Sequence, residues 1–223
     1  VLGRSYRVMK HAFVCMVTRL PFPVLEVHPD NGSEFFNAHM IRFWKDKVKG
    51  VKLSRSRPYQ KNDNRFVEQK NATLVRRYLG YDRLDTVRQT LALNELYLKM
   101  GIYYNFFQPV MRLTEKEWIP ASENRAGYVK RKYEAAKTPL DRLVATKAIS
   151  AEQQAQLLDW RARINPRTLR QEIYTVIDAL FALPLAEAGE SQDVFETLDV
   201  YPILEIDEVN PVALSFDPKT CSR

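Results

Sequence analysis

The chain has 223 residues, of which 45% are hydrophobic, and its formal net charge is +7. This length allows one large domain or a domain with an appendage, and the apolar content is enough for a core. No apolar run reaches the ~20 residues of a membrane span and no signal peptide is visible. Cys15 and Cys221 form no metal or disulfide pattern, so we expect reduced thiols in a cytoplasmic protein.

The charge is unevenly distributed along the chain. Residues 171–218 contain eleven Asp or Glu and no Lys or Arg, which leaves residues 1–170 with a net charge of +16 once Lys219 and Arg223 are allowed for. Such a basic body indicates a polyanionic partner, because Lys and Arg that neutralise phosphates release counterions. On charge alone, solubilising charge explains the body equally well. The acidic end is more typical of a solvated appendage.

The first half of the chain alternates predicted helices with short predicted strands. Apolar residues at helical spacing, with stop or cap residues at the ends, predict helices over 5–20, 37–48, 64–79 and 86–107. Short apolar runs between turn residues predict strands over 22–27 and 51–54. The polar, basic stretch 54–63 is expected to be a loop. This order of strands and helices is typical of a parallel α/β sheet.

The second half is predicted to be mainly helical. An irregular segment is expected over 109–120. Helices are predicted over 122–138, 139–148, 151–164 and 166–183. Ser150 with Gln153 forms an expected capping box, and Pro166 suits a first helical turn. Residues 199–206 alternate weakly and are expected to pair as a strand.

Two sequence blocks carry most of the functional information. The first, HPDNGSEF over residues 28–35, follows the predicted strand 22–27. The second, NRFVEQKN over residues 64–71, opens a predicted helix, and 37 residues separate Asp30 from Glu68. Together these blocks resemble the regions of the second and third acids in the DDE integrase and transposase core, especially of insertion-sequence transposases. The resemblance covers about residues 1–118.

The resemblance implies polynucleotidyl transfer on DNA during transposition. In this family three carboxylates hold two divalent metal ions, magnesium or manganese, which activate the attacking oxygen and stabilise the leaving oxygen. By position, Asp30 resembles the second acid and Glu68 the third, both as catalytic residues and metal ligands. The implied partners are DNA, as transposon ends and target, and further copies of the chain. We expect the protein to be nucleoid-associated when it is bound to DNA.

Each acid also has a simpler interpretation. A lone Asp-Asn-Gly is usually only a turn, and the match becomes specific through the residues around it. Glu68 could be a surface acid, but Arg65 stands where a capping box would need Ser, Thr, Asp or Asn. At helical spacing Glu68 borders an apolar stripe ending at Leu79, so we expect it to be partly desolvated. A metal ion would compensate for that cost.

Basic residues around Glu68 form the expected nucleic-acid surface. The loop and helix start carry cations and one aromatic side chain that can stack on a splayed base: Arg55, Arg57, Tyr59, Lys61 and Arg65. On the polar face of the helix, Lys70 and Arg77 lie seven residues apart and could both reach phosphates. An ordinary solvated helix face explains that pair equally well.

The first acid of the triad has no counterpart in residues 1–29, which contain Glu26 and no Asp. Glu26 lies on the same run of residues that leads to Asp30, so it cannot come from a neighbouring strand. We therefore expect an N-terminally truncated, partial RNase H-like core over 1–120, a helical extension over 121–184 and an acidic tail over 185–223. Such a chain is expected to be inactive by itself.

Two alternatives to a transposase remain open at this point. The chain could be a non-catalytic DNA-binding remnant of a decayed transposase, which differs from the enzyme by the carboxylate on an upstream strand. It could also be a basic helical interaction module, if Asp30 and Glu68 lie far apart.

Overall fold

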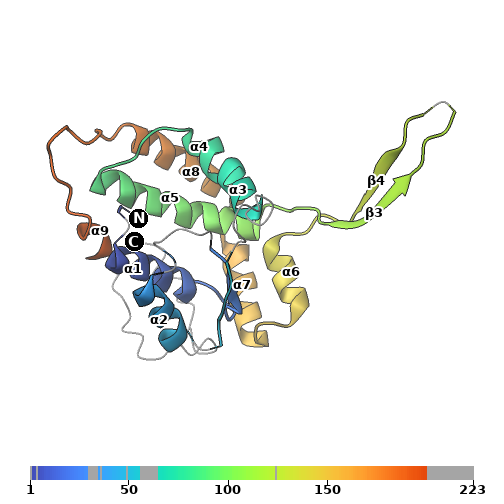
Figure 1. The fold of residues 1–223 in the computed structure, drawn as a ribbon, viewed down its shortest axis with the longest axis horizontal. Coiled ribbons are helices and arrows are strands. Elements are labelled where there is room, and N and C mark those ends of the chain that lie inside the picture. The colour runs from blue at the N-terminus through green and yellow to red at the C-terminus, as the bar shows by residue number, and fades with distance from the viewer. Residues whose placement is uncertain are drawn as a thin grey trace. The chain divides into compact units, whose positions relative to one another are not determined.

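A computed structural model describes residues 2–3, 5–29, 35, 37–48, 50–55, 65–123 and 125–199. The chain divides into two compact units, one formed by Val1–Leu96 with Ile173–Arg223 and the other by Tyr97–Glu172. The fold is mixed α/β: within the described ranges, helices accompany a two-stranded parallel sheet and an antiparallel hairpin (Figure 1). No described helix is both long and apolar enough to cross a membrane.

The first two helices begin at the predicted caps. Helix α1 (Tyr6–Thr18) starts where the Ser5 side chain accepts a hydrogen bond from the Val8 amide, and α2 (Ala38–Lys47) starts after Asn37. The Asn37 side chain accepts from the Met40 amide at 2.9 Å. Both caps satisfy amides that lack a partner within the first helical turn.

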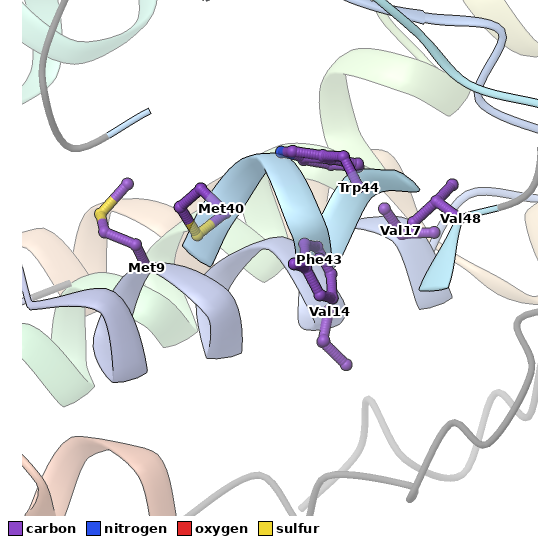
Figure 2. Packing of buried hydrophobic residues seen from close by; sticks show 7 residues of the cluster. All are labelled: Met9, Val14, Val17, Met40, Phe43, Trp44 and Val48. Atoms are coloured by element: carbon purple, nitrogen blue, oxygen red, sulfur yellow. The ribbon is translucent and has the colours of Figure 1, made fainter. Parts of the chain in front are cut away.

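The core of the first unit lies between α1 and α2. Their apolar faces meet in a buried cluster of Met9, Val14, Val17, Met40, Phe43, Trp44 and Val48 (Figure 2). The Trp44 ring lies 5.0 Å from the Phe13 ring and 5.2 Å from the Phe43 ring, with edge-to-face geometry in both contacts. Such aromatic contacts add specificity to the apolar burial.

A parallel strand pair packs against this cluster. Strand β1 (Glu26–Val27) pairs with β2 (Lys52–Leu53), and α2 lies between them in the chain, which confirms the predicted parallel order. Val27 and Leu53 are packed on the core. Both strands are shorter than the predicted runs 22–27 and 51–54, and backbone hydrogen bonds from the Lys52 amide to Leu25 and from the Ser54 amide to Val27 join them.

The predicted helix 64–79 is continuous but changes type in the middle. It consists of α3 (Arg65–Lys70), a π-helical stretch η2 (Asn71–Arg76) and α4 (Arg77–Leu79). Gly80 follows with φ 64°, a left-handed backbone conformation that glycine adopts without strain. A π turn is equivalent to one inserted residue, so it rotates the residues after it by about 100° relative to a regular α-helix.

The first unit also contains the start of the next helix and a short helix near the end of the described chain. Helix α5 (Val87–Phe106) starts with a reciprocal cap, in which Thr86 Oγ1 accepts from the Gln89 amide and Gln89 Oε1 accepts from the Thr86 amide. The Val87 amide donates to Gln192 Oε1 at 3.1 Å, which ties a segment 105 residues further along the chain to this helix start. The short helix α9 (Glu196–Asp199) ends the described chain, and the strand predicted for 199–206 lies almost entirely outside it.

The second unit contains a hairpin where the sequence predicted an irregular segment and a helix. Strand β3 (Leu113–Ile119) pairs antiparallel with β4 (Tyr128–Tyr133), so the predicted helix over 122–138 is wrong. Charged residues occupy both faces of each strand, and the apolar alternation that identifies a strand is absent. The pairing partner, up to 20 residues away, decides this structure.

The remaining helices are close to the predicted ones. They are α6 (Pro139–Thr146), α7 (Ala151–Arg163) and α8 (Pro166–Phe181). The capping box of Ser150 with Gln153 is confirmed, and Thr138 with Asp141 forms a second one. The Trp160 ring of α7 contacts the Phe106 ring of α5 with 4.9 Å between centroids, inside the second unit.

Candidate metal and nucleic-acid site

The sequence block that contains Asp30 directly follows β1. Strand β1 ends at Val27 and the structure describes His28 and Pro29, whereas Asp30 lies outside the described residues. Arg57, Tyr59 and Lys61 of the predicted basic loop also lie outside them. The convergence of Asp30 and Glu68 therefore stays a prediction.

A hydrogen-bonded group spans the two strands immediately before Asp30. Ser54 Oγ donates to a carboxylate oxygen of Glu26, and His28 Nδ1 lies 2.7 Å from Ser54 Oγ. Since the single hydroxyl proton is given to Glu26, the His28 Nδ1–H is the donor in the second bond. The group fastens the exit of β1 to β2 two residues before the candidate acid.

The Glu26 carboxylate is engaged by its neighbours. The hydrogen bond from Ser54, helped by the positive charge of Lys52, lowers the pKa of Glu26 below its usual value. Lys52 Nζ lies 3.8 Å from Glu26 Oε2. The resemblance in the sequence assigns no role at this site to Glu26, His28 or Ser54. A usable signal was the two-residue spacing of Glu26 and His28, which puts both on one face of a strand.

Glu68 lies on α3 with an exposed side chain, so the expected partial desolvation is wrong. The π turn explains the difference, because it rotates Glu68 away from the stripe that ends at buried Leu79. Ala72, one turn further along, is exposed as well. Among the residues that the structure describes, no cation forms an ion pair with the Glu68 carboxylate.

The predicted cations in the described part of the chain divide into two groups. Arg55 follows β2 directly and is exposed, as are Lys70 and Arg77 on either side of the π turn. Arg65 opens α3, and its side chain lies outside the described set. The Arg76 guanidinium lies 5.1 Å from the centre of the Tyr81 ring in a cation–π contact. Exposed cations therefore border the helix that carries Glu68.

The donor set suits a hard divalent cation. Asp30 and Glu68 offer oxygen ligands, which magnesium and manganese prefer to nitrogen or sulfur. No three His, Cys, Asp or Glu side chains gather as ligands within the described part of the chain, which does not include Asp30. A two-metal site would therefore need Asp30 and at least one more carboxylate.

A comparison with known proteins finds a partial match. Over 101 residues the chain is 44% identical to the uncharacterized protein y4rM of Sinorhizobium fredii. The match covers 45% of this chain and 28% of that protein, so the chain spans little more than a quarter of the relative's length. No family model and no solved structure matches the chain.

Proposed function

We propose that this chain supplies two of the three metal-binding carboxylates of a DDE-type transposase or integrase, together with part of its DNA-binding surface. The observation that carries the proposal is the pair of sequence blocks around Asp30 and Glu68, one directly after β1 and the other opening α3. A partial RNase H-like core is the fold that this function implies, and the parallel β1–α2–β2 unit supports it.

The position of the first block supports a ligand site. In open α/β sheets, ligands bind beyond the carboxyl ends of the parallel strands. Asp30 follows the carboxyl end of β1, whose exit is fastened by Ser54 and His28. The exposed Glu68 carboxylate, without an ion-pair partner among the described side chains, supplies the second ligand.

The chemistry would be an in-line displacement at phosphorus. When bound, divalent metal ions activate the attacking oxygen and stabilise the leaving oxygen. Asp30 and Glu68 would supply oxygen ligands, and Arg55 with one of the two cations Lys70 and Arg77 would neutralise phosphates of the DNA. The Glu26–Ser54–His28 group would position the segment that leads into Asp30.

The third carboxylate has to come from outside residues 1–29. Glu26 is the only acid in that range, and Ser54 and Lys52 already occupy its carboxylate. Asp30 and Glu68 alone cannot hold both metal ions, so joining of DNA ends requires a third carboxylate. The incomplete acid set also favours a second candidate function, DNA binding without chemistry.

Metal binding tests the proposal. Manganese added to the full chain should bind weakly, as followed by electron paramagnetic resonance, and D30N or E68Q should each abolish this binding. E196Q, on exposed Glu196 of α9, removes one carboxylate elsewhere and should leave the binding unchanged. Manganese binding that survives in the D30N/E68Q double variant would contradict the proposal, and strand transfer by the chain alone would contradict the need for a third acid.

A further inference from the structure

The β3–β4 hairpin is exposed along most of its length (Figure 1). Trp118 is 65% exposed and Tyr133 50%. A two-stranded hairpin is marginally stable by itself in water, so its own contacts and its base have to hold it. Single exposed aromatic side chains are common on protein surfaces, so any binding role of this ribbon has to rest on its charges as well.

The base of the hairpin is clamped by one arginine. Val110 and Lys137 form a β-bridge below the strands, and Arg142 of α6 donates to both of their carbonyl oxygens, at 2.7 and 2.5 Å. Arg142 also pairs with Glu134 at 2.6 Å. The ribbon is thus attached firmly to its own unit.

The two faces of the ribbon differ in charge. On one face, Lys132 pairs with Glu115 at 3.2 Å and Lys130 with Glu117 at 4.0 Å, so the charges compensate across the strands. On the other face, Lys116 stands directly opposite Arg131. No carboxylate of the described residues pairs with either of these two cations. Like charges in direct cross-strand register destabilise a strand pair.

Trp118 lies on the same face as this cationic pair, because residues two apart on a strand share a face. It is in register with Val129, and its indole covers Gly127: a Cβ atom at Gly127 would come within 2.8 Å of Trp118 Cζ2. Glycine is therefore required there for the ring to lie across the neighbouring strand. The result is a flat, exposed aromatic surface beside two uncompensated cations.

We propose that this face, formed by Lys116, Trp118, Val129 and Arg131 and called here the cationic ribbon face, binds duplex DNA. A ligand with closely spaced negative charges would relieve the repulsion between Lys116 and Arg131, and the phosphate backbone has such charges. A two-stranded β-ribbon fits the major groove in width. Trp118 adds an apolar surface for sugars or base edges.

The inference rests on the proposed partner, DNA, and not on the carboxylates. The salt dependence of duplex binding by the full chain tests it. K116Q/R131Q should make the slope of log affinity against log salt shallower by about 2, since each phosphate contact contributes ~0.9. The double substitution removes two charges that repel each other, so the hairpin should keep its fold.

A matched control removes the same charge from the same hairpin. K130Q/K132Q takes two lysines from the ion-paired face and should leave the slope unchanged, because the slope counts displaced counterions at phosphates. Equal changes in both variants, or no change in K116Q/R131Q, would overturn the inference. If K70A/R77A makes the slope of log affinity against log salt shallower but K116Q/R131Q does not, the inference about the ribbon fails while the proposed function stands.

A second measurement follows Trp118 directly. Duplex DNA should protect the most accessible tryptophan fluorescence from acrylamide quenching, and W118F should remove this protected fraction. Trp44 is only 2% exposed, so acrylamide quenches its fluorescence very little. Protection by a peptide of the acidic residues 185–218, without protection by DNA, would identify an acidic protein segment as the occupant and overturn the DNA assignment.

Discussion

At the scale of single residues, Ser54 links two groups that are far apart in the sequence. Its hydroxyl donates to Glu26 and accepts from His28, so one side chain both favours the ionised form of Glu26 and links the exit of β1 to β2. The two strands meet in register here, which places these three side chains on one face.

Removing this hydroxyl should change the titration of Glu26. In S54A the pKa of Glu26 should rise toward its ordinary value, because the largest stabilising contact of its carboxylate is lost. Carboxyl titration by NMR measures this shift. S54T keeps the hydroxyl and should retain the lowered pKa. An unchanged Glu26 titration in S54A would mean that Lys52 alone holds the carboxylate charged.

At the scale of elements, the base of the hairpin depends on Arg142. Its side chain is only 11% exposed and donates to two backbone oxygens and to Glu134. R142A should destabilise this base by about 1.5–3 kcal/mol, the range for hydrogen bonds from a charged group. Hydrogen exchange at the Val110 and Lys137 amides should accelerate accordingly.

Two variants sharpen that test. R142K keeps the charge but loses the planar guanidinium that donates to both carbonyl oxygens. Its Val110 and Lys137 amides should therefore be only partly protected from hydrogen exchange. R163A removes an exposed arginine paired with Asp159 four residues away and should change stability by less than about 0.5 kcal/mol. If the Val110 and Lys137 amides stay fully protected from exchange in R142A, Arg142 does not stabilise the base of the hairpin.

The π turn η2 changes what the cations of the α3–α4 helix can do together. In a regular helix Lys70 and Arg77 would share a face, but the turn rotates one of them by about 100°. K70A/R77A should therefore reduce the salt slope of DNA binding by about 1 rather than 2. A reduction of about 2 would mean that both reach phosphates, and no reduction would remove this helix from the DNA surface.

At the scale of the whole molecule, stability of the first unit depends on the contact between α1 and α2. Met40 is fully buried in that cluster, so M40A should lower the free energy of unfolding by about 2–5 kcal/mol. Chemical denaturation measures the change. M111A, at a methionine that is 62% exposed, is the matched control and should have little effect. Equal effects would contradict the core assignment.

The sequence by itself determined the features that depend on near neighbours. Caps such as Asn37 and the Ser150–Gln153 box, and the amphipathic helices that follow them, depend on residues three or four apart, so local patterns predict them. The strand–helix–strand order also predicted the parallel pairing of β1 with β2. The functional hypothesis likewise comes from the sequence, and the placement of Asp30 relative to Glu68 stays a prediction.

The tertiary structure alone decided the hairpin, the π turn and the group around Ser54. The strands of the hairpin are stabilised by partners up to 20 residues away, through ion pairs such as Lys132 with Glu115, and no short window of sequence contains both partners. The exposure of Glu68 was decided by a single π turn that regular spacing does not reveal. Local patterns predicted the helices better than the site for two physical reasons. The strand pairing joins residues that are far apart in the sequence, and the π turn rotates one part of a helix relative to the other.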